Sequence, residues 1–330
     1  MTQLVAVLGT RYANLAVEHE VLDPTGAHVV RGDGADPDDI ATVAGDADVI
    51  VAGSRPRFTA AVLDRLRCAA IVRAGVGVDS IDLAAARERG IDVAYVPDYG
   101  TEAVAQHTLA LVLAATRQLV AAHDLVRGGG WGLGDLRPLH LPDALTAGVV
   151  GHGRIGARVA QLLVSVGFGR VLAHDPVATV PPASRVEACG LDDLLGASNV
   201  VSLHVPGAVE GAPLLDADRL ARLRPGSVVV NTARGSLIDT PALAAALATG
   251  TPAMAALDVH DPEPPDLAVF ADVMDRVLLT PHMAWCSEAT EAELRRRAAL
   301  EARRVLQGEA PRHLATPPEP AGPAVAREAP

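Results

Sequence analysis

Residues 147–156 read AGVVGHGRIG, a short apolar run followed by three glycines in the spacing G-x-G-x-x-G. Between a strand and a helix, this spacing is typical of a turn that holds a dinucleotide pyrophosphate on the first amides of the helix. A helical pattern continues from the turn to about Val166, so the required context is present. The stretch predicts a parallel α/β domain that binds a dinucleotide. An ordinary tight turn is the alternative, because the chain holds 30 glycines.

Asp175 follows the next apolar run, 19 residues after Gly156. A carboxylate at this place accepts a hydrogen bond from the ribose 2′-hydroxyl and repels a 2′-phosphate. The neighbours His174 and Pro176 supply no positive charge that would reverse the preference. We therefore predict NAD rather than NADP as the cofactor, with a solvated aspartate as the alternative.

Short apolar runs alternate with helical patterns on both sides of the glycine turn, as in parallel βα units. Before residue 98, strands are expected at 4–8, 47–52, 70–72 and 92–96, and helices at 37–44, 59–66 and 82–89. One long apolar helix is expected over 101–125, followed by a glycine-rich loop at 128–134. A second series of strands is expected at 147–150, 170–174, 199–205, 227–231, 255–259 and 277–279.

This order predicts an α/β fold with two parallel-sheet domains, Rossmann-like or flavodoxin-like. We expect an NAD-binding domain over residues 98–283, inserted into a substrate-binding domain made of residues 1–97 and 284–314. Residues 315–330 are expected to be a disordered tail, because five prolines leave too little apolar surface to offset the entropy of ordering.

The composition argues against several classes of partner. The formal charge of −12, from 40 Asp and Glu against 28 Lys and Arg, argues against nucleic acid. The N-terminus lacks the basic and long apolar regions of a signal peptide, and no run of about 18 apolar residues is present, so we expect no membrane and a cytoplasmic protein. Cys68, Cys189 and Cys286 show no metal-ligand spacing, and we expect free thiols and no metal.

Three further polar segments follow expected strands of the second domain: VNTARG at 230–235, LDVHDPEP at 257–264 and LTPH at 279–282. Together with the glycine turn and with VRAGVGVDSID at 72–82, they resemble the D-isomer-specific 2-hydroxyacid dehydrogenases in order and spacing. The resemblance extends to about residue 314. Several matches in register are more specific than any one of them.

The resemblance implies that Arg234, Glu263 and His282 are catalytic, and the chemistry fits. An arginine binds the carboxylate of a 2-oxo acid while polarising the neighbouring ketone. His282 gives the ketone oxygen its proton, and a carboxylate on the other ring nitrogen, that of Glu263, favours the imidazolium. In the oxidative direction neutral His282 is the base. Each residue taken alone has an equally good alternative. Arg234 could cap a strand end, Glu263 could be an exposed loop acid, and His282 could be a histidine in a polar turn.

The same resemblance implies further contacts, for which strand-end packing is the alternative. Amides of Val76 and Gly77 meet the substrate carboxylate, and Thr232 and Asp258 approach the nicotinamide. His260 is left unassigned. The substrate-binding candidates are Arg73, Val76, Gly77 and Trp285, and the cofactor-binding candidates are Gly151, Gly153, Arg154, Ile155, Gly156, Asp175, His204, Val205, Pro206, Thr232, Ala233 and Asp258.

The stretch TPHMAWCSE at 280–288 is similar to the C-terminal-binding-protein corepressors, a branch of the same family. There a tryptophan lines the substrate pocket, which makes Trp285 a specificity candidate; a core or hinge aromatic is the alternative. Two functions therefore compete: an NAD-dependent reductase that converts a 2-oxo acid reversibly to a D-2-hydroxy acid, and an NADH-sensing interaction module with little turnover. The intact catalytic residues favour the enzyme, similar to phosphoglycerate dehydrogenases and to hydroxypyruvate and glyoxylate reductases. Family members commonly pair through the nucleotide domain, so we expect a homodimer.

Overall fold

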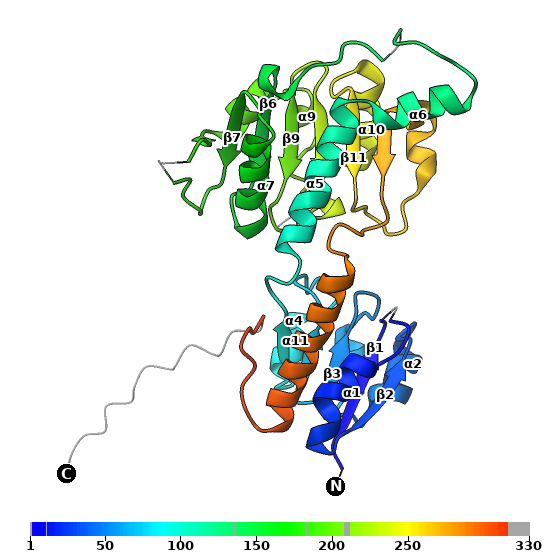
Figure 1. Ribbon diagram of the computed structural model, residues 1–330. Coiled ribbons are helices and arrows are strands. Elements are labelled where there is room, and N and C mark those ends of the chain that lie inside the picture. The colour runs from blue at the N-terminus through cyan, green and yellow to red at the C-terminus, as the bar shows by residue number, and fades with distance from the viewer. Residues whose placement is uncertain (1, 11, 135, 182–183, 208–211, 316–330) are drawn as a thin grey trace, which may run out of the picture. The chain divides into compact units, whose positions relative to one another are not determined.

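A computed structural model of the protein describes residues 2–10, 12–134, 136–181, 184–207 and 212–315. The expected tail lies outside these residues from position 316 onward. The chain divides into two compact units (Figure 1). Unit 1 comprises Met1–Tyr99 and Glu288–Pro330, and unit 2 comprises Gly100–Ser287. Unit 2 is thus one continuous insertion, and the boundaries expected after residues 97 and 283 fall a few residues before the observed ones.

Unit 1 is built on a parallel sheet of five strands in the order β2-β1-β3-β4-β5, which is the flavodoxin-like order expected for an α/β unit. The strands are β1 (Leu4–Leu8), β2 (His28–Gly32), β3 (Val49–Ala52), β4 (Ala70–Arg73) and β5 (Asp92–Tyr95). The helices are α1 (Ala16–Leu22), α2 (Pro37–Ala44), α3 (Ala60–Leu63), α4 (Leu83–Glu88) and α11 (Glu288–Leu306), with a 3₁₀ turn η1 (Asp23–Thr25).

The edge strand β2 and the helix α1 were not predicted, and the helix expected over 59–66 is shorter than expected. Strand β2 was missed because of its local sequence. It lies at the sheet edge and exposes His28 and Arg31, so it lacks the continuous apolar run of the buried strands. The last helix, α11, is tied to α1 by a buried ion pair between Arg295 and Glu18. Arg295 also lies over the ring of Tyr12, 4.3 Å from its centroid.

Unit 2 is built on a parallel sheet of seven strands in the order β12-β11-β10-β9-β6-β7-β8. The strands are β6 (Thr146–Val150), β7 (Arg170–His174), β8 (Glu187–Ala188), β9 (Val200–Leu203), β10 (Val228–Asn231), β11 (Met254–Leu257) and β12 (Val277–Leu279). The helices are α5 (Thr101–Thr116), α6 (Leu119–Arg127), α7 (Arg154–Ser165), α8 (Leu191–Ala197), α9 (Ala217–Leu220) and α10 (Thr240–Thr249), with 3₁₀ segments η2 (Pro142–Ala144), η4 (Gly235–Leu237) and η5 (Leu267–Arg276).

The strand order of unit 2 reverses between β6 and β9, which are neighbours in the sheet. The chain runs outward from β6 to β7 and β8 on one side, and from β9 to β12 on the other. In such sheets ligands bind outside the carboxyl ends of the strands at the reversal. The fold therefore places a ligand site beside the glycine turn, which follows β6.

The single helix expected over 101–125 is wrong, because the chain breaks at Arg117 and Gln118 into α5 and α6, which meet at 58°. Gln118 takes a left-handed conformation, with φ of 50°, and its side-chain amide donates to the carbonyl of Leu136. Among the described residues, no single helix is long and apolar enough to span a membrane; α5 and α6 reach that length and hydropathy only as a bent pair.

Candidate active site

The glycine turn has the backbone geometry that the sequence predicted. Gly151 has φ of +94°, and a Cβ atom on Gly156 would lie 1.9 Å from the carbonyl oxygen of Gly151. A side chain is therefore excluded at both positions. A Cβ atom on Gly153, in contrast, would meet nothing within 4 Å. The turn thus leaves open space in front of α7, whose first amides have no partner within the helix, and a pyrophosphate fits this space.

Asp175 follows β7 and is bound to the glycine turn. Its carboxylate accepts from the amide of His152 at 2.7 Å, and from those of Val177 at 2.8 Å and Ala178 at 2.7 Å. Burial raises the pKa of Asp175, but these three amide donors together outweigh it and hold the pKa below its ordinary value. The carboxylate is therefore ionised, as recognition of a ribose diol requires.

His204 follows β9 and packs against the same turn. Its amide donates to the carbonyl of Val150 at 2.7 Å, and a Cβ atom on Gly151 would lie 2.4 Å from its carbonyl oxygen. Protein surrounds the ring on most sides, although part of its surface stays accessible, and this burial lowers the pKa of His204 to about 3. The neutral ring contacts the hydroxyl of Ser202 at 2.8 Å. The segment 204–206 thus borders the predicted adenosine side without adding charge.

The loops after β10 and β11 meet at one glycine. A Cβ atom on Gly235 would lie 2.1 Å from the carbonyl carbon of His260, so only glycine allows the two loops this close approach. Asn231 shapes the first loop: its side-chain amide donates to the carbonyl of Arg234 at 2.8 Å, and its side-chain oxygen accepts from the amide of Ala233 at 3.0 Å. Arg234 is thereby carried beside the loop that bears Glu263.

His282 and Glu263 form the pair that the sequence predicted. The distance between Nδ1 of His282 and Oε2 of Glu263 is 2.9 Å, and both side chains are 40% exposed. Burial raises the pKa of Glu263, but the hydrogen bond and charge of His282, together with the amide of His260, lower it below its ordinary value. An ionised Glu263 can only accept, so Nδ1 carries the hydrogen and Nε2 is the nitrogen that exchanges a proton.

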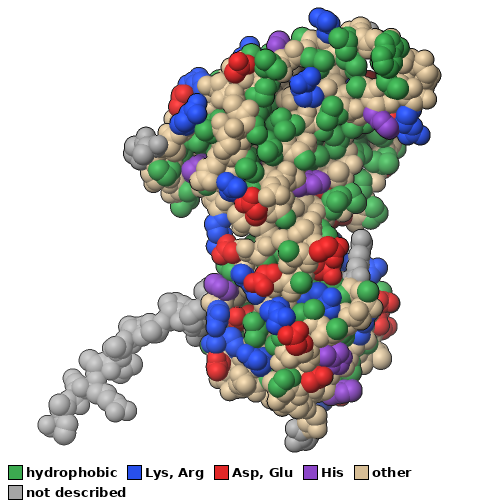
Figure 2. All heavy atoms as spheres, in the orientation of Figure 1, with side chains coloured by type: hydrophobic (Ala, Val, Ile, Leu, Met, Phe, Trp, Pro, Cys, Tyr) green, Lys and Arg blue, Asp and Glu red, His purple; other side chains and the backbone are tan. Residues whose placement is uncertain are grey.

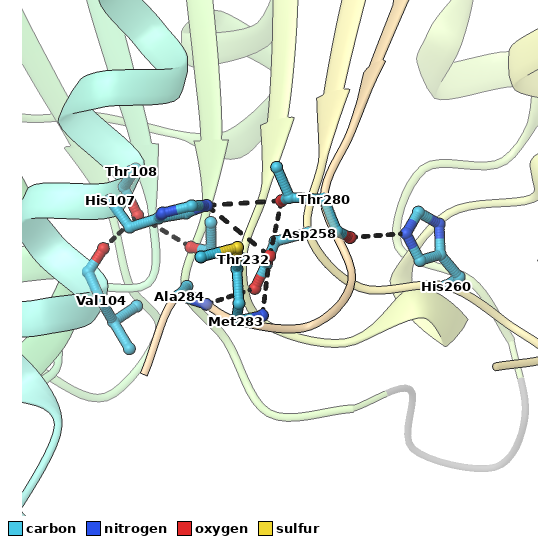
Figure 3. A network of polar contacts seen from close by, with 9 residues as sticks. All are labelled: Val104, His107, Thr108, Thr232, Asp258, His260, Thr280, Met283 and Ala284. Atoms are coloured by element: carbon cyan, nitrogen blue, oxygen red, sulfur yellow. Dashed lines mark hydrogen bonds and ion pairs between the residues drawn. The ribbon is translucent and has the colours of Figure 1, made fainter. Parts of the chain in front are cut away.

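Asp258 fixes the turn that carries His282, and Figure 3 shows its contacts with Thr280, Met283 and Ala284 on that turn. Its carboxylate is fully buried and accepts from the Thr280 hydroxyl at 2.6 Å and from the amides of Met283 and Ala284 at 2.9 and 2.8 Å. Its main-chain carbonyl accepts from the amide of His282 at 2.7 Å. His282 has φ of 52°, a left-handed conformation that costs about 1–2 kcal/mol in a residue with a Cβ atom. Bonds to Asp258 offset this cost.

His107 joins this network from α5, and the sequence analysis did not single it out. Its Nε2 lies 3.3 Å from the hydroxyl of Thr280 and 3.6 Å from the nearer carboxylate oxygen of Asp258. Figure 3 shows the ring on α5 directed at these two groups. The signal in the sequence was weak: His107 is the titratable residue of the mainly apolar stretch 103–116. The hydroxyl of Thr232, a cofactor candidate, is paired at 2.9 Å with that of Thr108.

The predicted substrate residues divide between the two units. Arg73, Val76 and Gly77 lie at the end of β4 and beyond it in unit 1, where the guanidinium of Arg73 donates to the carbonyl of Ala74 and Val76 is exposed. Trp285 belongs to unit 2, where a Cβ atom on Gly100 would lie 3.6 Å from the Cβ of Trp285. The roles of these residues toward a substrate stay predictions. The described residues include no cluster of three or more His, Cys, Asp or Glu that could hold a metal ion.

Comparison with known proteins decides the family. Residues 109–284 match the family described as D-isomer specific 2-hydroxyacid dehydrogenase, NAD binding domain. The chain belongs to this family. The match confirms the expected family and the NAD-binding character of unit 2, whose glycine turn and Asp175 lie within the matched residues. The similarity to the corepressor branch stays a prediction.

Individual relatives agree with this assignment. A D-3-phosphoglycerate dehydrogenase of Mycobacterium tuberculosis is 37% identical over 273 residues, which cover 82% of this chain and 50% of the relative. The chain thus spans about half the length of the first curated relatives that it matches. A hydroxypyruvate reductase of Thermotoga maritima is 32% identical over 290 residues, 87% of this chain and 90% of the relative.

Among solved structures, a D-lactate dehydrogenase from Aquifex aeolicus in complex with NAD and lactic acid is 26% identical. It has a TM-score of 0.85 and covers 95% of this chain and 99% of its own. This likeness confirms the expected α/β fold with two parallel-sheet domains. These relatives are named for dehydrogenase or reductase activity, and none of them supports the alternative of an interaction module.

Proposed function

We propose that the protein reduces a small 2-oxo acid to a D-2-hydroxy acid with NADH, and catalyses the reverse oxidation with NAD. The single observation that carries the proposal is the 2.9 Å contact between His282 and Glu263 at the carboxyl edge of a sheet whose glycine turn fits a dinucleotide. An imidazole held by an ionised carboxylate is suited to exchange a proton with the oxygen of a reacting alcohol or ketone. Bound NADH would supply the hydride.

In this proposal each residue of the site has a separate task. The guanidinium of Arg234 binds the substrate carboxylate and polarises the ketone, since a planar fork of donors suits both groups. His282 gives the proton on Nε2 to the oxygen during reduction and takes it back during oxidation. Glu263 keeps the hydrogen on Nδ1 and stabilises the charge that the ring carries before it donates. The hydrogen bond fixes the ring nitrogen that reacts.

The cofactor-binding residues follow from the same geometry. The first amides of α7, beginning at Arg154 and Ile155, would hold the pyrophosphate next to Gly153. Asp175 would accept from the ribose, and His204, Val205 and Pro206 would lie beside the adenosine. Thr232, Ala233 and Asp258 would border the nicotinamide. For the substrate we propose contacts from Arg73, Val76, Gly77 and Trp285.

The reaction is tested by following NADH oxidation at 340 nm with glyoxylate, hydroxypyruvate, phenylpyruvate and branched 2-oxo acids. At least one of them should be turned over, and Glu263→Gln should lower kcat by about 100-fold, within the range of general acid–base effects. The exposed carboxylate of Glu309 provides a control, since Glu309→Gln lies in unit 1 and should leave kcat unchanged. Tight NADH binding without turnover of any 2-oxo acid would overturn the proposal and favour a binding module.

We further propose that the protein is a homodimer joined through unit 2. Hydrophobic side chains are frequent on the face of unit 2 that is turned to the viewer in Figure 2. Exposed apolar residues occur on α6 and in the glycine-rich segment after it, namely Leu119, Val120, Leu125, Val126, Trp131 and Leu133. Burying such a surface favours association. Light scattering should give twice the 34.0 kDa of one chain, and a monomer mass would contradict the proposal.

A further inference from the structure

The hydrogen positions between His107, Thr280 and Asp258 follow from the contacts. An ionised carboxylate cannot donate, so the 2.6 Å contact requires the Thr280 hydroxyl to give its hydrogen to Asp258. The Thr280 oxygen is then an acceptor toward His107, 3.3 Å away. The nitrogen that faces it, Nε2, must therefore carry a hydrogen. The contacts form a directed chain from His107 through Thr280 to Asp258.

Asp258 is the residue through which this chain of contacts can affect the proposed reaction. The carboxylate is fully buried, and a buried charge is tolerated only when hydrogen bonds satisfy it. Its hydrogen-bond donors among the described residues lie in the segment 280–284, on both sides of His282, and its own carbonyl binds the amide of His282. A shift of this carboxylate would therefore move the turn that aims the imidazole at Glu263.

We propose that His107 is a positioning residue for the proton donor. Through the Thr280 hydroxyl it holds the Asp258 carboxylate, and Asp258 keeps His282 in its left-handed conformation with Nδ1 on Glu263. The inference rests on the proposed role of His282. His107 is only 20% exposed, and α5 packs against α7, β10 and β11 in unit 2, so the ring starts from a rigid support.

The other titratable groups around the network have different partners. His260 directs its Nε2 at the main-chain carbonyl of Thr280, at 3.1 Å, and not at the hydroxyl. The ring of His282 is bound to Glu263. Among the described residues, His107 is therefore the titratable side chain that contacts both the hydroxyl of Thr280 and the carboxylate of Asp258.

A double-mutant cycle tests the chain of contacts. His107→Leu and Thr280→Val should each lower kcat about tenfold, while the Kd for NADH changes less than twofold. Because both substitutions break the same chain, the double variant should be no worse than the more impaired single variant. His107→Gln, which retains a donor, should recover most of the loss. Thr116→Val, which removes a hydroxyl from the same helix, and His28→Leu, on the exposed edge strand β2, should match the wild type.

Losses that multiply in the double variant, or equal losses in His107→Gln and His107→Leu, would overturn the proposal. A second readout does not need turnover: nitrogen NMR of protein labelled in its histidine rings, with the signal assigned by its absence in His107→Gln. His107 should be in the Nε2–H tautomer at pH 8, and an Nδ1–H tautomer would refute the chain even if no 2-oxo acid is reduced. Failure of the cycle in an active enzyme would leave the proposed function intact. Absence of all turnover would contradict that function, while the tautomer would still decide this inference.

Discussion

The glycine turn after β6 and the His282 turn after β12 lie at the same edge of one sheet, but they are held in different ways. The first is shaped by the absence of side chains, since a Cβ atom at Gly156 would overlap the backbone of Gly151. In the second, His282 has a left-handed backbone conformation, and the turn is held by the carboxylate of Asp258, which lies far from it in the sequence. In the proposed function, backbone shape would therefore serve cofactor binding, whereas side-chain contacts between residues far apart in the sequence would serve proton transfer.

Two aspartates show the same difference. Asp175 and Asp258 each accept backbone amides from a neighbouring turn. Asp175 keeps part of its surface accessible and can still meet a ribose, whereas Asp258 is fully buried and binds the turn around His282. Substitutions in the two turns should consequently separate cofactor binding from chemistry.

The largest effect is expected at His282, the proposed proton donor. His282→Ala should lower kcat by about 1000-fold, because general acid–base groups contribute about 10²- to 10⁴-fold. NADH binding should stay within twofold of the wild type, as measured by fluorescence titration. His28→Ala, exposed on the edge strand β2 of unit 1, is the matched control. Turnover within tenfold of the wild type would show that another group moves the proton.

The next effect compares two glycines of the nucleotide turn. Gly156→Ala should lower the free energy of unfolding by about 2–3 kcal/mol, because its methyl group overlaps the backbone. Gly153→Ala should leave the free energy of unfolding unchanged. It should weaken NADH binding at least tenfold, since its methyl group enters the space left for the ligand. Urea unfolding and NADH titration measure both. Equal effects of the two substitutions on stability would contradict the comparison.

A smaller change is expected in the choice between cofactors. Asp175→Asn keeps one oxygen, which can accept from the amides of Val177 and Ala178, but it loses the oxygen that accepts from His152 and removes the negative charge. The ratio of kcat/KM for NADPH to that for NADH should rise about 10-fold, because a 2′-phosphate is no longer repelled. Asp192→Asn, at an exposed ion pair with Arg222, should leave the ratio unchanged. An unchanged ratio in Asp175→Asn would place the ribose elsewhere.

The smallest effect concerns stability as a function of pH. The pKa of His204 is lowered to about 3, so the unfolded chain, with a histidine pKa of about 6.5, binds the proton first as the pH falls. The contribution of neutral His204 to the free energy of unfolding is fully present above pH ~6.5. It should decline by up to about 2 kcal/mol at pH ~5. His204→Gln should remove this decline in urea unfolding. A decline of the same size in the variant would assign it to other groups.

Much of this arrangement was predictable from the sequence, because it is local. The glycine turn, Asp175 and the strands 4–8, 170–174 and 277–279 each depend on neighbouring residues, and the structure has these strands at the expected bounds. The pairing of His282 with Glu263 was also predicted, although from the family resemblance and not from residue spacing.

The rest depended on contacts between residues far apart in the sequence. The contact between His107 and Thr280 joins residues 173 positions apart, and the residues next to His107 in the sequence do not indicate it. The break between α5 and α6 was missed because an apolar pattern extends across it, whereas the carbonyl that Gln118 binds belongs to Leu136. The edge strand β2 lacked the apolar run that marked its neighbours.

The scarcity of aromatic residues has a practical consequence for spectroscopy. The chain holds two tryptophans, Trp131, which is 91% exposed, and Trp285, three residues after His282 and beside Gly100. Their emission therefore comes from two distinct environments of unit 2. Replacing either indole with phenylalanine leaves a protein with one emitter, so that Trp131 reports on the glycine-rich segment and Trp285 on the proton-donor turn, without an added dye.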